Sequence, residues 1–368
     1  MRKYLKYLVL FLLTALFFVW FAHNLNWTEV RESLSKSDWR LVAVAGALIS
    51  VGYLVRAFRW RTLLSPITPT KIRELFAATT MGFGAVFLFG RAGEVVRPVV
   101  LPLRDHRVKP AASFITIMVE RLCDMFAVVV LFALNLLWFQ VPANRAAEYA
   151  DVRKGGLLVL IFVALGLLGL VWFRHHSQIP ISWLDKKLAS WRFVPERIRR
   201  LVVHLLEQLA QALGVFTNAR DLFATLFLTT LLWLDVLLST WLIMKAFGLA
   251  SSFRDAMFIM GWALVGSLFP GPGGGAGGFH ATTKYGLTTF LGVEPNLAAA
   301  LTIIMHLVYF APALLFGFYY FLRSDISGAR LRQLASTEAV EHAVEDDDIV
   351  VVDSEIVAQD GVGIAESR

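Results

Sequence analysis

The sequence contains little of what catalytic or disulfide-stabilised soluble proteins depend on. Its one cysteine, Cys123, can form neither an intramolecular disulfide nor a cysteine-based metal cluster. Charged residues make up only 17% of the chain, and the sequence has no zinc-type His/Glu spacing, no nucleophile elbow and no Walker loop. We therefore expect no metal and no cofactor, and a role other than that of an enzyme is favoured.

Apolar residues dominate the composition instead. They make up 57% of the chain, which includes 11 Trp and 29 Phe, and the mean hydropathy is +0.63. These values are typical of an all-α protein that crosses a membrane several times. The first apolar segment, Leu5–Phe21, has a long apolar core and no small-residue cleavage site after it. It is therefore interpreted as a retained span rather than a signal peptide.

The formal net charge of +7 is distributed unevenly. Residues 336–368 carry ten Asp/Glu and one Arg, whereas the other 335 residues carry 34 Lys/Arg and 18 Asp/Glu. We divide the chain into a transmembrane domain, residues 1–332, and an acidic disordered tail, residues 333–368. Because the basic residues lie in loops between spans, they suit anionic lipid headgroups, and no nucleic-acid partner is expected. Composition leaves a homo-oligomer open.

The apolar runs predict six transmembrane helices. These are Leu5–His23, Leu41–Leu64, Ala111–Phe139, Leu157–Phe173, Leu222–Phe247 and Leu297–Leu322. Asn24–Arg40 is expected to be a polar loop, and residues 174–220 a basic amphipathic segment on the cytoplasmic membrane surface. Near the end of the second span, Arg56, Arg59 and Arg61 are interpreted as snorkelling or interfacial residues.

Two further apolar segments, Leu75–Leu103 and Phe253–Leu291, are interrupted by glycine and proline. The second contains PGPGGGAGGFH (Pro270–His280), with six glycines and two prolines in eleven residues. Backbone without helical hydrogen bonds is tolerated at membrane depth only where it is buried in protein or lines a wet cavity. We therefore expect two re-entrant broken hairpins and a functional site beside them.

Basic residues predict the orientation of the chain. Residues 174–220 carry eight Lys/Arg and residues 65–75 plus 104–110 carry five, against three in each of the loops 24–40 and 140–156. Both termini are therefore expected on the cytoplasmic side. With this orientation, the two triplets of span, hairpin and span are inverted copies in topology, which is typical of transporters.

The first broken segment contains the charged sequence GRAGEVVRP. Arg91, Glu94 and Arg97 are three residues apart and would share one face of a helix. At a hairpin tip, the two arginines could grip a phosphate group, and Glu94 could orient them or bind a cationic headgroup. An ordinary charged cytoplasmic loop is the alternative.

A second charged group lies within the third span. Glu120, Arg121 and Asp124 should face the interior and be partnered, because bare charges are costly in a membrane, and Arg121 could pair with Asp124. A structural salt bridge and a direct role at the site are both open. Asp235 and His306 are interpreted as helix-packing residues.

The glycine run could bring backbone amides close to an anionic ligand. The positions predicted to contact a ligand here are Gly273, Gly274, Gly275 and Gly277, and His280 and Lys284, which are one turn apart, could add charge beside them. An exposed turn between two helices is the alternative.

Three pieces of this sequence resemble the flippase-like transmembrane domain family of lysylphosphatidylglycerol synthases. They are Phe89–Pro98, Glu120–Asp124 and Pro270–Gly278, whose order and spacing match, and the resemblance extends over Leu5–Arg323. Family members often have a glutamate just after the glycine run, where this chain has Phe279 and His280. No soluble aminoacyl-transfer domain follows Arg332, so the resemblance does not imply lysine transfer.

The resemblance implies a protein that binds or moves a lipid in the inner membrane. The lipid would be an anionic phospholipid or a polyprenyl-phosphate-linked sugar, held by Arg91 and Arg97. Two alternatives stay open. One is an accessory or scaffold protein for a membrane enzyme, acting through residues 174–220 or the acidic tail. The other is an intramembrane transferase that depends on Glu120 and Asp124.

Overall fold

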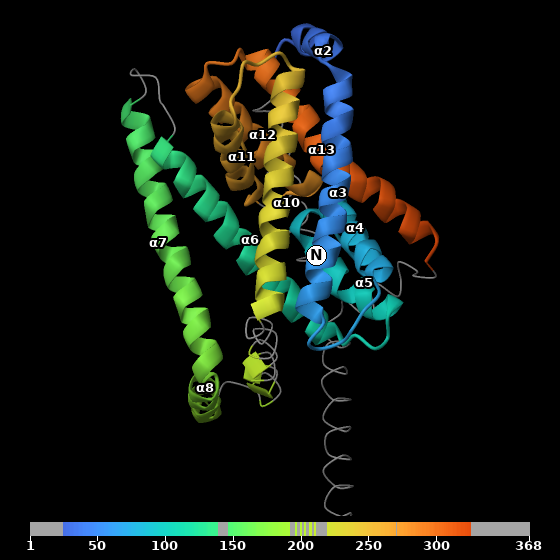
Figure 1. The fold of residues 1–368 in the computed structure, drawn as a ribbon, viewed down its shortest axis with the longest axis vertical. Coiled ribbons are helices and arrows are strands. Elements are labelled where there is room, and N and C mark those ends of the chain that lie inside the picture. The colour runs from blue at the N-terminus through green and yellow to red at the C-terminus, as the bar shows by residue number, and fades with distance from the viewer. Residues whose placement is uncertain are drawn as a thin grey trace, which may run out of the picture.

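The computed structural model describes residues 25–138, 146–191, 219–269 and 271–324, together with residues 196, 199, 200, 202, 203, 206, 207 and 210. Within these residues the fold is a helical bundle without strands (Figure 1). The expected first span, Leu5–His23, and the acidic tail lie outside the described residues.

Two triplets of elements form the centre of the bundle. The first consists of α3 (Trp39–Leu64), a hairpin of α4 (Ile72–Phe89) and α5 (Val96–Arg104), and α6 (Pro110–Trp138). The second consists of α10 (Ala219–Ala246), a hairpin of α11 (Phe253–Ser267) and α12 (Pro272–Tyr285), and α13 (Pro295–Leu322). The order of elements agrees with the two triplets expected from hydropathy.

The packing of the triplets is reciprocal. The first helices of the two triplets, α3 and α10, pack along each other. The first hairpin helix of each triplet packs on the last helix of the other triplet, α4 on α13 and α11 on α6. In the same way, α3 contacts α13 and α10 contacts α6. In Figure 1, α3 descends while α10 ascends, and the first hairpin occupies the lower half of the bundle while the second occupies the upper half. This arrangement is that of an inverted repeat.

Side-chain caps define where several of the helices begin. Asp38 caps α3, a capping box of Ser252 and Asp255 starts α11, and Glu294 accepts hydrogen bonds from the first amides of α13. Four described helices, α3, α4, α10 and α13, are long and apolar enough to cross a membrane. The expected total of six spans stays a prediction.

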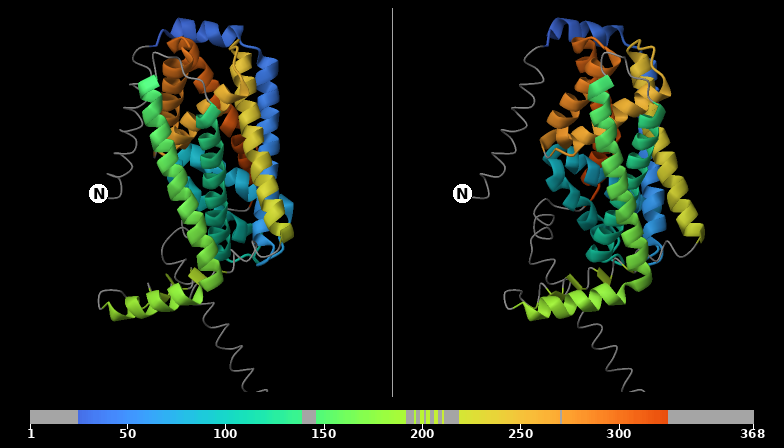
Figure 2. Two further views of the ribbon diagram at one scale, coloured as in Figure 1. Left: turned by 60° about the vertical axis from the view of Figure 1, so that its left-hand side comes forward. Right: turned by 90° about the vertical axis from the view of Figure 1, so that its left-hand side faces the viewer.

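Two short helices lie near the two ends of the structure. The prediction that Asn24–Arg40 is a polar loop is wrong in part. This segment contains the helix α2 (Trp27–Lys36), which is capped by Asn26 and packs on α13. At the other end, α7 (Ala146–His176) leads into α8 (Gln178–Ser190), which runs nearly perpendicular to it (Figure 2). The orientation of α8 suits a helix that lies along a membrane surface, as expected for the start of residues 174–220.

The outward faces of the long helices are apolar. Exposed large side chains include Val51, Leu54 and Phe58 on α3, and Leu315 and Phe318 on α13. The core contains the fully buried Trp60 and Phe258. A bundle that is apolar outside and contains charged groups inside is the reverse of a soluble protein and suits a lipid environment.

Candidate functional site

The interior of the first triplet contains a network of buried ion pairs. Glu120 and Asp124, one turn apart on α6, both point inward and are buried. The expectation that Glu120, Arg121 and Asp124 face the interior and are partnered is confirmed for these two carboxylates, whereas Arg121 is partnered but partly exposed. Their partners are arginines from α3 and α5, so the network joins three helices.

Arg97 of α5 is held by Glu120. Its Nη1 and Nη2 donate to the two carboxylate oxygens of Glu120 at 2.7 and 2.8 Å. The Arg97 guanidinium carbon lies 4.1 Å from the centroid of a Trp60 ring, and the Trp60 indole donates to Thr116 at 3.0 Å. The two charged groups are therefore packed as well as paired, which suits a fixed structural element.

Arg59 of α3 is held by Asp124. Its Nη1 and Nη2 donate to Asp124 at 2.6 and 3.0 Å, and Nη1 also lies 3.2 Å from the Thr229 hydroxyl on α10. The Trp233 indole donates to Asp124 at 3.2 Å, and Arg59 Nη2 lies 3.4 Å from Glu120. The interpretation of Arg59 as an interfacial residue is wrong, because its side chain is fully buried.

Two other arginines touch the network only loosely. Arg56 Nη1 is 3.9 Å from Asp124, beyond hydrogen-bonding distance, and Arg121 Nη2 is 3.4 Å from Glu120. The expected pairing of Arg121 with Asp124 is replaced by this contact with Glu120. Both guanidinium groups lie over the ring of Phe83 on α4, with centroid distances of 5.0 and 5.3 Å.

The ion-paired groups carry an excess of positive charge. Two carboxylates face four guanidinium groups, those of Arg56, Arg59, Arg97 and Arg121. Asp235 of α10 lies beside Gly52 of α3, and its Oδ2 has no hydrogen-bond partner. The net charge of these groups stays positive even when Asp235 is counted as ionised. Uncompensated positive charge in an apolar interior favours the binding of an anion.

The tip of the first hairpin is a 3₁₀ segment, η1 (Gly90–Val95). It contains both Arg91 and Glu94, but Glu94 is exposed and is not the partner of Arg97. The Arg91 side chain lies outside the described part of the structure. Gly93 packs directly against the backbone of Ala85, so the tip folds back tightly onto α4.

The glycine run forms a left-handed turn at the start of α12. Gly273, Gly274 and Gly275 have φ angles of 69°, 65° and 81°, a region that side-chain-bearing residues rarely adopt. The helix α12 packs against both α4 and η1, so the two hairpins meet inside the bundle. The structure thus brings together the two motifs that the sequence singled out, although residues 99–269 lie between them in the chain.

Beside this meeting point lies a cluster of aromatic rings that includes two histidines. His280 and His306 have ring centroids 4.8 Å apart, and Phe279 stacks on His306 at 4.7 Å. Phe87 of α4 contacts His306 at 5.8 Å and lies one turn from Phe83, so α4 connects this cluster to the arginines. Gly277 is buried, and Lys284 is partly buried further along α12.

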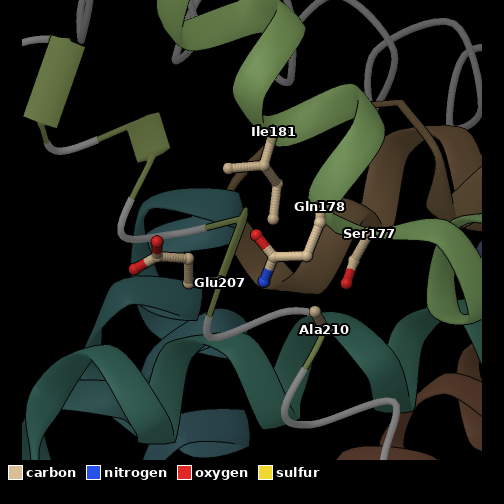
Figure 3. Close-up of a pocket in the computed structure, with 5 residues that line it drawn as sticks. All are labelled: Ser177, Gln178, Ile181, Glu207 and Ala210. Atoms are coloured by element: carbon tan, nitrogen blue, oxygen red, sulfur yellow. The ribbon is translucent and has the colours of Figure 1, made fainter.

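A surface depression lies elsewhere, at the junction of α7 and α8 (Figure 3). Its volume is about 370 Å³, and it is lined by Ser177, Gln178, Ile181, Glu207 and Ala210. None of the predicted site residues lines it. Across the described residues, no group of three or more His, Cys, Asp or Glu side chains is placed to hold a metal ion.

Sequence reasoning missed Arg56 and Arg59 as members of the site. The available signal was two carboxylates in one span with only one cation, Arg121, in that span, and two arginines three residues apart within the apolar α3. Buried charges in one span need partners of opposite charge in another, and this rule would have linked Arg56 and Arg59 to Glu120 and Asp124.

A comparison with known families finds a match over most of the chain. The family model described as the lysylphosphatidylglycerol synthase TM region matches residues 7–317. No curated protein and no solved structure matches the chain. The chain therefore belongs to this family, and it is a membrane protein of a family linked to lipid handling.

Proposed function

We propose that this protein binds the anionic headgroup of a membrane lipid inside its helical bundle and moves that lipid between leaflets. The observation that carries the proposal is the network of four arginines, of which Arg121 is partly exposed, around the buried carboxylates of Glu120 and Asp124, because its excess positive charge favours an anion. Phospholipid and polyprenyl-phosphate headgroups carry such an anion.

The inverted arrangement of the hairpins supports movement rather than binding alone. One hairpin enters the bundle from each end, and the two meet where α12 packs against α4 and η1. Transporters built from inverted repeats with broken helices alternate access around a site at such a meeting point. We place both termini in the cytoplasm and the protein in the inner membrane, as the distribution of basic residues predicts.

The carboxylates favour this role over that of a transferase. Glu120 and Asp124 each accept two hydrogen bonds from one arginine, at 2.6 to 3.0 Å. A catalytic acid or base needs a proton to exchange with substrate, and a carboxylate held by a guanidinium fork is poorly suited to that task.

Two measurements test the proposal. Mass spectrometry of co-purified lipids should show an anionic or polyprenyl lipid enriched over the bulk membrane composition. Vesicles reconstituted with the protein should then expose a fluorescent anionic lipid from the inner leaflet faster than protein-free vesicles, as measured by dithionite quenching. A bulk-like lipid profile together with equal quenching in both vesicle types would reject the proposal and favour the scaffold alternative.

A further inference from the structure

The four arginines of the network differ in how many of their donors are engaged. A guanidinium group has five N–H donors, and Arg59 and Arg97 each direct both terminal nitrogens at one carboxylate. Arg56 has its carboxylate contact at 3.9 Å and Arg121 has one at 3.4 Å. Arg56 and Arg121 therefore have more N–H groups left to donate to a ligand than Arg59 and Arg97 have.

The ring of Phe83 contacts both of these arginines and lies further from Arg97, at 6.0 Å. Arg56 comes from α3 and Arg121 from α6, yet both guanidinium groups lie over the same ring of α4. Tyr53 packs edge-on against Phe83 at 5.5 Å, which limits the movement of the ring. A guanidinium that stacks on an aromatic face keeps its N–H edge available, and an edge of this kind matches phosphate oxygens.

The pair also has access to the outside of the bundle. The Arg121 side chain is 42% exposed, whereas that of Arg56 is 15% exposed. Met118 and Met125 are exposed on α6 three residues before and four residues after Arg121, so they lie on the same helix face. A phosphate at Arg121 would thus have an apolar surface directly beside it, which suits a lipid chain and not a free ion.

We infer that Arg56 and Arg121 bind the phosphoryl group of the lipid across the face of Phe83, while Arg59 and Arg97 position Glu120 and Asp124. The inference rests on the proposed function and assigns its ligand contacts. It also separates two roles within one network. Arg56 and Arg121 touch the ligand, whereas Arg59 and Arg97 hold the helices that present them.

The test measures binding of short-chain phosphatidic acid to the full-length protein in detergent. Arg56→Gln and Arg121→Gln should each weaken binding at least about tenfold, because each removes a charge-assisted contact. Arg61→Gln is the matched control, since Arg61 is exposed on the same helix as Arg56. It should bind like the wild type. The melting temperature of both test variants should stay near that of the wild type, because Glu120 and Asp124 keep their paired arginines.

Three results would each overturn one assignment, and they can be told apart. If the wild type prefers phosphatidic acid to short-chain phosphatidylcholine but both test variants bind as tightly, the assignment of Arg56 and Arg121 fails while the proposed function stands. If inorganic phosphate competes at the same concentration as phosphatidic acid, the ligand is a free phosphate and the lipid assignment fails. If the wild type shows no preference between the two lipids, the proposed function itself fails.

Discussion

Arg97 and Glu120 form a two-pronged ion pair, with N–O distances of 2.7 and 2.8 Å, that joins α5 to α6 inside an apolar bundle. Glu120→Gln would leave Arg97 with an uncompensated buried charge. Removing one partner of such a pair costs about 3–5 kcal/mol. We expect a clear fall in the melting temperature of the detergent-solubilised protein. Glu94→Gln, on the exposed tip of the same hairpin, should melt like the wild type. Equal melting temperatures for the two variants would contradict this role of the pair.

Gly82 lets α4 approach α5 closely. A Cβ at this position would lie 2.7 Å from Arg97 Cβ and 3.2 Å from Arg97 Cα. Gly82→Ala should therefore displace α5, disturb the pair with Glu120 and lower the melting temperature. Gly46→Ala, on α3, meets no atom within 4 Å and should be neutral or slightly stabilising. The prediction fails if Gly82→Ala is tolerated as well as Gly46→Ala.

Gly274 combines a left-handed backbone with a tight contact. Its φ is 65°, and an added Cβ would lie 2.5 Å from the Phe310 ring. Gly248 has a similar φ of 76° but open space around it. Left-handed backbone alone costs about 1–2 kcal/mol per residue for alanine. Gly274→Ala should lower the melting temperature more than Gly248→Ala does, because the steric overlap with Phe310 adds to the backbone strain. Equal effects would mean that only the backbone angle matters.

The inverted topology predicts opposite accessibility for the two hairpin bases. His106 follows α5 and Arg254 lies at the start of α11, and both are exposed. In a Cys123→Ser background, His106→Cys should react with a membrane-impermeant maleimide only from the cytoplasmic side and Arg254→Cys only from the opposite side. Reaction of both from one side would contradict the inverted arrangement.

The long helices were predictable because a span needs a continuous apolar run, and such a run is visible in the chain itself. The expected Ala111–Phe139 corresponds to α6, Pro110–Trp138, and the expected Leu297–Leu322 corresponds to α13, Pro295–Leu322. The helix α2 was missed because its sequence is mostly polar, and its stability depends on the Asn26 cap and on Asn296 of α13, whose amide donates to Glu29 at 2.6 Å. A contact between residues so far apart in the chain is not encoded in local pattern.

The candidate site was predictable in part. Charges in an apolar span must face inward, so Glu120 and Asp124 were correctly placed. Their partners were not, because α3 is apolar on nearly all sides and its pattern does not show which face is internal. Arg59, 65 residues from Asp124, was therefore assigned to the interface, although its side chain is fully buried.

The sequence by itself determined that this is a multi-pass helical membrane protein with two glycine- and proline-broken segments, because hydropathy and backbone chemistry act locally. Only the tertiary structure decided which charges neutralise one another and which keep donors for a ligand. That distinction depends on the rotation and crossing of α3, α5 and α6, which bring Arg59 to Asp124 and Arg97 to Glu120 and leave Arg56 and Arg121 over Phe83.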